Sequence, residues 1–170
     1  MTIARLILLP AIASLAACAA TPMSSPPTHT APLVDASGAT IGIVKHWADS
    51  AGTYFDVRAN RLSPGDHGVH LHMVGRCDGP GFTTAGGHWN PATKLHGHRN
   101  PGGWHAGDLG NLTAGPDGKA RAMLRLPAGS DVADQDGSAL VIHARPDDEA
   151  TDPSGNSGDR IACAVIAPPR

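Results

Sequence analysis

The sequence has no basic block and little charge of either sign. Its 13 Lys and Arg residues are outnumbered by 15 Asp and Glu residues, and charged residues make up only 16% of the chain. Proteins that bind nucleic acids present a basic patch that neutralises phosphates. We therefore expect no nucleic-acid partner, and an anionic substrate would need a local positive charge to attract it.

The sequence also lacks any segment with an amphipathic helical period over three turns, and it contains no internal repeat. Short runs rich in Val, Ile, Thr and aromatic residues recur instead between Gly, Pro, Asn and Asp turns, among them GTYFDVRANRL, GVHLHMV and SALVIHA. Runs of this kind are typical of β-strands. Seven or eight of them predict an all-β sandwich or barrel.

The apolar run at residues 1–17 is too short to span a membrane and is typical of a secretory leader. It ends in LAAC, which resembles the bacterial lipobox and predicts cleavage before Cys18 and lipidation of its thiol; an ordinary leader cut at a nearby A-x-A site is the alternative. Residues 18–31 are then the lipid-attachment site and a flexible Pro/Ser/Thr-rich tether, and residues 32–170 are the domain. Ala19 favours a periplasmic location at the outer membrane.

The sequence has only three cysteines, Cys18, Cys77 and Cys163. If Cys18 is acylated, an even pair remains in an oxidising compartment. A Cys77–Cys163 disulfide would close a loop of about 85 residues and contribute about 4–5 kcal/mol in the chain-entropy model. Two unpaired thiols are the alternative, which an exported protein disfavours.

Two segments, residues 75–111 and 144–160, contain few strand-forming residues. Long loops inside a compact domain are usually functional or disordered. The first segment contains Trp89, Trp104, a cysteine and four histidines, which argues against disorder. A metal together with a disulfide would suffice to order it.

Histidine is concentrated in one part of the chain. Seven of the ten histidines lie between residues 67 and 105, and His143 ends the strand-like run ALVIH. Within HGVHLHMVG, His70 and His72 are two residues apart and would share one face of a strand. Imidazole nitrogens suit copper and zinc, and carboxylate oxygens also suit zinc. The pattern therefore indicates a metal site.

The motifs GDHGVHLHMVG, AGGHWNP, LHG, WHAGDLGNL, VIHARPDD and GDRIACAVI, taken together and in this order, resemble the copper/zinc superoxide dismutases, specifically their exported bacterial branch. The resemblance covers essentially the whole domain. It implies an eight-stranded Greek-key β-barrel with two long functional loops. It also implies an enzyme that converts superoxide to oxygen and hydrogen peroxide by copper redox cycling with zinc support, protecting the cell envelope.

The resemblance assigns one copper and one zinc ion per chain, which share one bridging imidazole. The implied copper ligands are His70, His72, His88 and His143. The implied zinc ligands are His88, His96, His105 and Asp108. The copper site would stand on strands, whereas zinc would cross-link the first long loop.

Further roles follow from the same resemblance. Asp147 matches a carboxylate that hydrogen-bonds one copper and one zinc histidine, whereas Asp148 is expected to be a solvated loop acid. Arg160 matches the arginine that draws the anionic substrate toward copper. The second long segment has no lysine to assist it. Arg76 or Lys94 in the first segment could assist Arg160 instead.

The remaining histidines are expected to lie outside the metal site. His67 matches a structural position that holds backbone, and His98 is a less favoured competitor of His96 for zinc. His29 in the tether is expected to be incidental, and His46, on a strand far from the cluster, is expected to lie on the surface.

A non-catalytic copper-binding or copper-delivery module on the same fold is the competing hypothesis. The presence of both the bridging His88 and the loop arginine Arg160 favours the enzyme. The sequence leaves open whether the protein is a monomer or a homodimer. Membrane attachment is expected only through the lipidated N-terminus.

Overall fold

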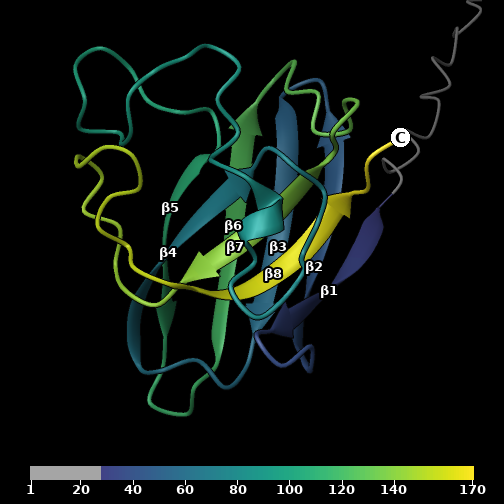
Figure 1. Cartoon of the computed structure of the whole chain (residues 1–170), viewed down its shortest axis with the longest axis vertical. Coiled ribbons are helices and arrows are strands. Elements are labelled where there is room, and N and C mark those ends of the chain that lie inside the picture. The colour runs from purple at the N-terminus through teal and green to yellow at the C-terminus, as the bar shows by residue number, and fades with distance from the viewer. Residues whose placement is uncertain (1–27) are drawn as a thin grey trace, which may run out of the picture.

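Eight antiparallel strands form a closed barrel in the computed structural model, which describes residues 28–170 (Figure 1). Around the barrel the strands follow the order β1-β2-β3-β6-β5-β4-β7-β8, so three neighbouring pairs are not consecutive in sequence. The strands are β1 (His29–Asp35), β2 (Thr40–Asp49), β3 (Gly52–Ala59), β4 (Gly65–His72), β5 (Asp108–Ala114), β6 (Ala120–Pro127), β7 (Ser138–His143) and β8 (Arg160–Ala167). This arrangement confirms the predicted all-β, eight-stranded barrel.

Alternating side chains decide what lies inside and outside the barrel. On β4, Val69 and Leu71 point into the core and have no exposed surface. His70 and His72 lie between and beyond them in the strand and therefore point to the opposite, outer face. They are nevertheless fully buried, because loops cover this face. The strand thus supplies both core packing and candidate ligands.

Two long connections lie side by side next to the barrel (Figure 1). One joins β4 to β5 and contains a short 3₁₀ turn, η1 (Thr83–Ala85); the other joins β7 to β8. A backbone hydrogen bond of 3.0 Å from Arg99 N to the Glu149 oxygen ties them together. Trp89, in the first connection, packs into the barrel core.

The predicted loop boundaries were too wide at their C-terminal ends. Residues 108–111, expected in the first loop, belong to β5, and Arg160 begins β8. In β5 the burial alternates along DLGNLTA, so its small and polar residues still fit a strand. The glycine-rich composition hid this alternation.

The barrel also begins earlier than predicted. Residues 29–31, expected at the end of the tether, are paired with β2 as part of β1, because Ala31 is a buried core residue. The expected leader and the lipidation site Cys18 lie outside the described residues. Within residues 28–170 no helix has the length and apolarity needed to cross a membrane.

Candidate metal centre

Four imidazoles, which we call the first cluster, meet on the outer face of the barrel. His70 and His72 come from β4, and His143 ends the neighbouring strand β7. His88 enters from the β4–β5 connection through a β-bridge with His72. Each residue offers one ligand nitrogen, and the four nitrogens lie within 4.8 Å of one another. The structure therefore brings together all four residues that were expected to bind copper.

Each histidine of the first cluster has one buried nitrogen without a hydrogen-bond partner among the described residues. These atoms are His70 Nδ1, His72 Nε2, His88 Nε2 and His143 Nε2. An unsatisfied buried polar group costs about 1–3 kcal/mol, and native proteins contain few of them. The opposite ring nitrogen can be fixed by backbone, as when His72 Nδ1 donates to the Gly86 oxygen at 2.9 Å. Four imidazole nitrogens that lie close together without hydrogen-bond partners fit a copper ion.

A second cluster surrounds Asp108 at the start of β5. Its Oδ1 atom lies 2.8 Å from His88 Nδ1, 3.0 Å from His96 Nδ1 and 3.1 Å from His105 Nδ1. Its Oδ2 atom accepts from the backbone nitrogens of His105 and Gly97. Three imidazole nitrogens and one carboxylate oxygen are a donor set typical of zinc. The expected zinc ligands are therefore also close together.

A compact set of ligand atoms on the Asp108 side also includes His70. However, His70 Nε2 donates to Asp147 Oδ2 at 2.8 Å. His105 Nδ1 instead lies 3.1 Å from Asp108 Oδ1 and 3.3 Å from His88 Nδ1. The contacts of His105 favour it over His70 as the third imidazole of the second cluster.

His88 belongs to both clusters. Its Nδ1 faces Asp108, and its Nε2 is one of the unpaired nitrogens of the first cluster. The ring also lies edge-on to His105 and over His70, with centroid separations of 5.3 Å and 3.9 Å. A single imidazole thus separates two groups of donor atoms, which is the arrangement that a metal on each ring nitrogen requires.

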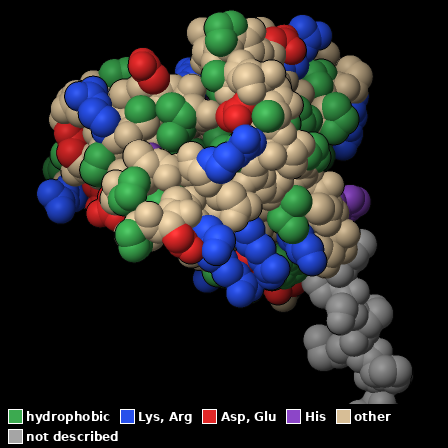
Figure 2. Space-filling model, turned by 90° about the horizontal axis from the view of Figure 1, so that it is seen from below, with side chains coloured by type: hydrophobic (Ala, Val, Ile, Leu, Met, Phe, Trp, Pro, Cys, Tyr) green, Lys and Arg blue, Asp and Glu red, His purple; other side chains and the backbone are tan. Residues whose placement is uncertain are grey.

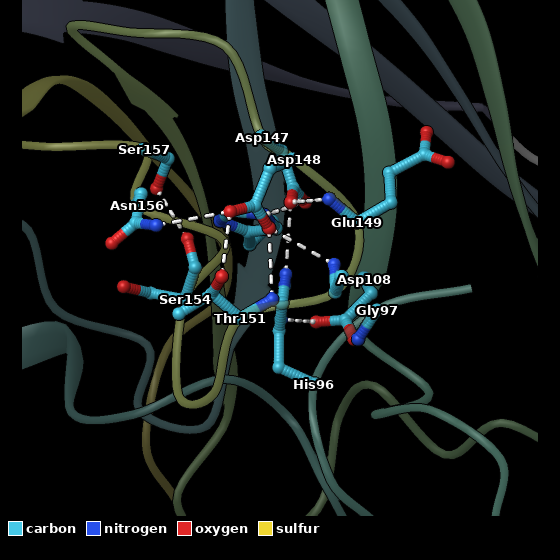
Figure 3. A network of polar contacts seen from close by, with 12 residues as sticks. His96, Gly97, Asp108, Asp147, Asp148, Glu149, Thr151, Ser154, Asn156 and Ser157 are labelled. Atoms are coloured by element: carbon cyan, nitrogen blue, oxygen red, sulfur yellow. Dashed lines mark hydrogen bonds and ion pairs between the residues drawn. The ribbon is translucent and has the colours of Figure 1, made fainter. Parts of the chain in front are cut away.

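Asp147, in the β7–β8 connection, contacts one histidine of each cluster, and Figure 3 shows it beside His96 of the second cluster. Its two carboxylate oxygens accept hydrogen bonds from His70 Nε2 at 2.8 Å and from His96 Nε2 at 2.9 Å. The side chain of Asn111 on β5 holds the Asp147 backbone through two further hydrogen bonds. A carboxylate in this position fixes the tautomer and ring orientation of both histidines.

The first cluster consists of neutral imidazoles. Burial lowers the pKa of His70 to about 3 and that of His143 to about 4. Burial also lowers the pKa of His72 well below its usual value, and the nearby His88 lowers it further. Neutral imidazole is the form that binds metals, so these rings need lose no proton to accept an ion.

Carboxylates dominate the second cluster. Burial alone would lower the pKa of His96, but Asp108 and Asp147 outweigh it and raise that pKa to about 9. The pKa of each carboxyl group lies below its usual range, because hydrogen bonds from histidines overcome the effect of burial. Without a metal, His96 therefore carries a proton on each ring nitrogen. A cation at Nδ1 would replace one of these protons.

Arg160, at the start of β8, is held beside the first cluster. Its guanidinium donates to the Phe82 oxygen at 2.8 Å and to the Gly86 oxygen at 2.7 Å, the same carbonyl that His72 contacts. A cavity of about 370 Å³ is lined by Arg160 together with His88 and other residues of both long connections. The structure thus places one fixed positive charge at the mouth of the site.

Cys77 and Cys163 form a disulfide, with their Cα atoms 5.7 Å apart, which confirms the predicted pairing. Cys77 lies in the β4–β5 connection, and Cys163 lies in β8, three residues beyond Arg160. The bond therefore joins the strand that carries the arginine to the loop whose carbonyls hold it. Its 86-residue sequence separation corresponds to about 4–5 kcal/mol of loop-closure entropy.

Two other histidines lie outside both clusters. His67 contacts backbone oxygens with both ring nitrogens, at 2.7 Å to His143 and at 2.9 Å to Ser63. It holds β4 against the end of β7, in agreement with the structural role expected for it. His98 is exposed and contacts Trp104, with the two rings tilted at 57° and their centroids 4.8 Å apart. It belongs to neither set of converging ligand atoms.

Sequence reasoning missed two residues that shape the second cluster. Asp152 Oδ1 accepts a hydrogen bond from His96 N at 2.8 Å. Gly155 has a φ of +62°, and a Cβ atom there would collide with Asp147 Oδ1 and His96 Nε2. The sequence DPSGN signals a turn but not the approach of a ligand. Only the fold reveals why glycine is needed.

The fold and site define a class of protein: a closed antiparallel barrel that presents two adjoining donor clusters for metals, joined by one histidine. The sequence model of the family "Copper/zinc superoxide dismutase (SODC)" matches residues 39–166. The chain belongs to this family.

Bacterial relatives show the same relationship. The superoxide dismutase-like protein YojM of Bacillus subtilis is 42% identical over 147 residues, covering 81% of this chain and 75% of the relative. Superoxide dismutase [Cu-Zn] 1 of Aquifex aeolicus is 38% identical over 147 residues, covering 82% and 86%. The crystal structure of a SOD-like protein from Bacillus subtilis has a TM-score of 0.77 at 42% identity, covering 81% of this chain and 98% of that one. Cu/Zn superoxide dismutase from Brucella abortus has a TM-score of 0.69 at 29% identity, covering 82% and 99%.

Proposed function

We propose that this protein is a copper/zinc superoxide dismutase, which converts superoxide to oxygen and hydrogen peroxide. The observation that carries the proposal is the set of four unpaired, buried imidazole nitrogens joined through His88 to the Asp108 cluster. Relatives named as copper/zinc superoxide dismutases support it. A site built only for structure would not leave four such nitrogens unsatisfied.

In this proposal each cluster holds one metal ion. Copper is held by His70, His72, His88 and His143, and zinc by His88, His96, His105 and Asp108. When bound, copper supplies one-electron redox chemistry, and zinc, which has none, supplies a fixed positive charge. Asp147 orients His70 and His96, one histidine for each metal.

His88 and Arg160 have distinct tasks in the reaction. Two superoxide anions and two protons give one oxygen and one hydrogen peroxide, so the site must attract anions and deliver protons. Arg160 provides the attraction, because its guanidinium stays charged and is fixed by two carbonyl oxygens. His88 can hold a proton at Nε2 whenever that nitrogen is not a ligand, because its Nδ1 faces the second cluster and would keep the ring anchored there.

Metal analysis combined with a superoxide-consumption assay tests the proposal directly. We expect one copper and one zinc per chain, and turnover that a chelator abolishes and added metals restore. Copper bound without turnover would instead support the copper-delivery alternative. A chain that takes up neither metal would overturn both interpretations.

The role of Arg160 is tested by Arg160→Ala, with Arg145→Ala as the matched control. Arg145 is exposed in the same β7–β8 connection. We expect Arg160→Ala to lower kcat/KM by roughly tenfold at low ionic strength and to flatten its salt dependence. Arg145→Ala should leave kcat/KM and its salt dependence unchanged. An unchanged kcat/KM for Arg160→Ala would remove the attraction role.

We also propose an envelope location, with the mature chain attached to the outer membrane through a lipidated Cys18. The leader-like residues 1–17 and the lipobox-like LAAC support this proposal. Mass spectrometry of the mature N-terminus provides the test. Acylated Cys18 is the expected result, and a processed N-terminus at another residue would exclude the lipid anchor.

A further inference from the structure

A second histidine pair lies away from both clusters. His29 on β1 and His46 on β2 face each other directly in the antiparallel register. In the closed barrel, β2 is separated from β4, which carries His70 and His72, by the same number of strands in either direction. Neither histidine of the pair takes part in the chemistry proposed above, so the pair requires an explanation of its own.

The two imidazole rings lie close together on the neighbouring strands. Their centroids lie 5.2 Å apart with an interplanar angle of 23°. Within the first cluster, His72 and His143 have a centroid separation of 5.8 Å and the same angle of 23°. Directly opposed residues on antiparallel strands hold their side chains within reach of each other, so the spacing is set by the backbone. The pair therefore has nearly the same ring separation and the same interplanar angle as His72 and His143, a pair proposed to bind copper.

The surroundings keep one ring ordered and the other accessible. His46 stacks on the buried Phe55 at a centroid separation of 6.3 Å, which fixes its plane. Burial lowers the pKa of His46, and the nearby His29 lowers it further, so its imidazole is neutral at pH 7. His29 is exposed. Figure 2 shows an exposed histidine beside the point where the grey segment begins.

We propose that His29 and His46 form a third metal site, which takes a divalent first-row transition-metal ion such as Cu²⁺, Ni²⁺ or Zn²⁺. Imidazole is a preferred ligand for these ions, and affinity follows the usual order with Cu²⁺ the tightest. The pair supplies two nitrogen ligands, and water completes the coordination. Because the ligands lie on β1 and β2, bound metal clips the first strand of the barrel to the second.

The test uses the full-length protein with its copper and zinc sites already loaded, and Ni²⁺ as the probe. Equilibrium dialysis measures Ni²⁺ uptake, and ¹H–¹⁵N spectra locate it by paramagnetic broadening. We expect one further equivalent per chain, with broadening centred on residues 29–31 and 44–46. We also expect Ni²⁺ to raise the Tm, because an ion that binds only the folded state stabilises it.

The variants His29→Ala and His46→Ala should each weaken this uptake by roughly tenfold or more. The matched control is His98→Ala, which removes an exposed histidine from the β4–β5 connection and should change nothing. His29 is exposed, so its loss leaves the fold intact, as unchanged copper and zinc contents would verify. Equal Ni²⁺ uptake by all three variants and the unmodified chain, or broadening elsewhere, would overturn the proposal.

Discussion

The two metal clusters share His88 but are stabilised in opposite ways. The first cluster contains only imidazoles, three of them on strands β4 and β7, and its inward-facing nitrogens have no partners within the described chain. The second cluster lies largely in the β4–β5 connection, and its histidines donate to Asp108 and Asp147. The strands of the barrel hold the first cluster in place, whereas contacts between histidines and carboxylates hold the second.

This difference indicates which cluster tolerates metal loss. Strand geometry persists without metal, so the first cluster remains assembled with the energetic cost of its unpaired nitrogens. The second cluster stays together because the protonated His96 substitutes for the positive charge of a metal. Without metal, we therefore expect the second cluster to be stabilised by Asp108 and Asp147, and the first cluster by the packing of the strands on the barrel core.

The largest effect should come from removing the central carboxylate of the second cluster. In the metal-free protein, Asp108→Ala removes one of the two carboxylates that pair with the buried, protonated His96 and should lower the free energy of unfolding by about 3–5 kcal/mol. His143→Ala in the first cluster removes an imidazole with an unpaired nitrogen and should cost less. Urea denaturation of both variants measures the difference. Equal losses would show that the two clusters are stabilised alike.

For enzymatic activity we expect the opposite order, with the larger loss coming from a substitution in the first cluster. His143→Ala should reduce superoxide turnover by more than about 100-fold, because even indirect partners of metal ligands typically contribute 10–100-fold. Copper content should fall while zinc content is retained, since His143 contacts only the first cluster. His98→Ala serves as the control and should keep full activity. Retained turnover in His143→Ala would exclude the proposed copper site.

The next effect concerns the loop that supports the second cluster. Gly155→Ala and Gly129→Ala both place a side chain at positive φ, +62° and +82°. A Cβ atom at residue 129 meets nothing within 4 Å, whereas one at residue 155 collides with Asp147 and His96. Gly129→Ala should therefore cost about 1–2 kcal/mol, and Gly155→Ala roughly 1–3 kcal/mol more. Thermal unfolding with and without zinc measures both.

If Gly155→Ala cost no more than Gly129→Ala, only backbone strain would matter at residue 155. If instead the excess vanished on zinc removal, the collision would act through the metal rather than through Asp147 and His96. The pair of variants thus separates local strain from damage to the cluster.

Sequence reasoning identified the barrel, the disulfide and the histidines that converge, because each leaves a local or family-specific pattern. It could place His70 and His72 on one strand face from their spacing alone. It could not show that Gly155 lies against Asp147, because that approach joins residues whose contact depends on loop packing. The ligand roles themselves remain predictions until a metal is bound.

Sequence reasoning expected His29 to be incidental, because it lies in the predicted tether, and His46 to lie on the surface, on a strand far from the cluster. Their direct opposition depends on the β1–β2 register, including the bulge between Leu33 and Val34. A shift of one residue would turn one histidine to the other face of the sheet. Register of this kind is not visible in the sequence, so the pair emerges only in the folded chain.

The smallest predicted effect is a change in the pKa of Asp148, the neighbour of Asp147. Although partly exposed, its carboxylate accepts hydrogen bonds from Thr151 N, the Thr151 hydroxyl, Ala150 N and the Asn156 side chain (Figure 3). These contacts lower the pKa of Asp148 to about 2, with the Thr151 backbone contributing most. Asp148 was expected to be merely solvated, whereas it organises the turn.

A carboxyl group with a depressed pKa stabilises the folded state above its unfolded pKa and loses this contribution as the pH falls through the folded value. For Asp148 the contribution is therefore complete above pH 3.8 and lost as the pH falls toward about 2. Thr151→Val removes the hydroxyl donor but keeps the backbone donor, so the pKa should rise only part of the way toward 3.8. Carbon-13 NMR titration of the Asp148 carboxyl group measures this change. A wild-type pKa near 3.8 would mean that the turn forms without help from this carboxylate.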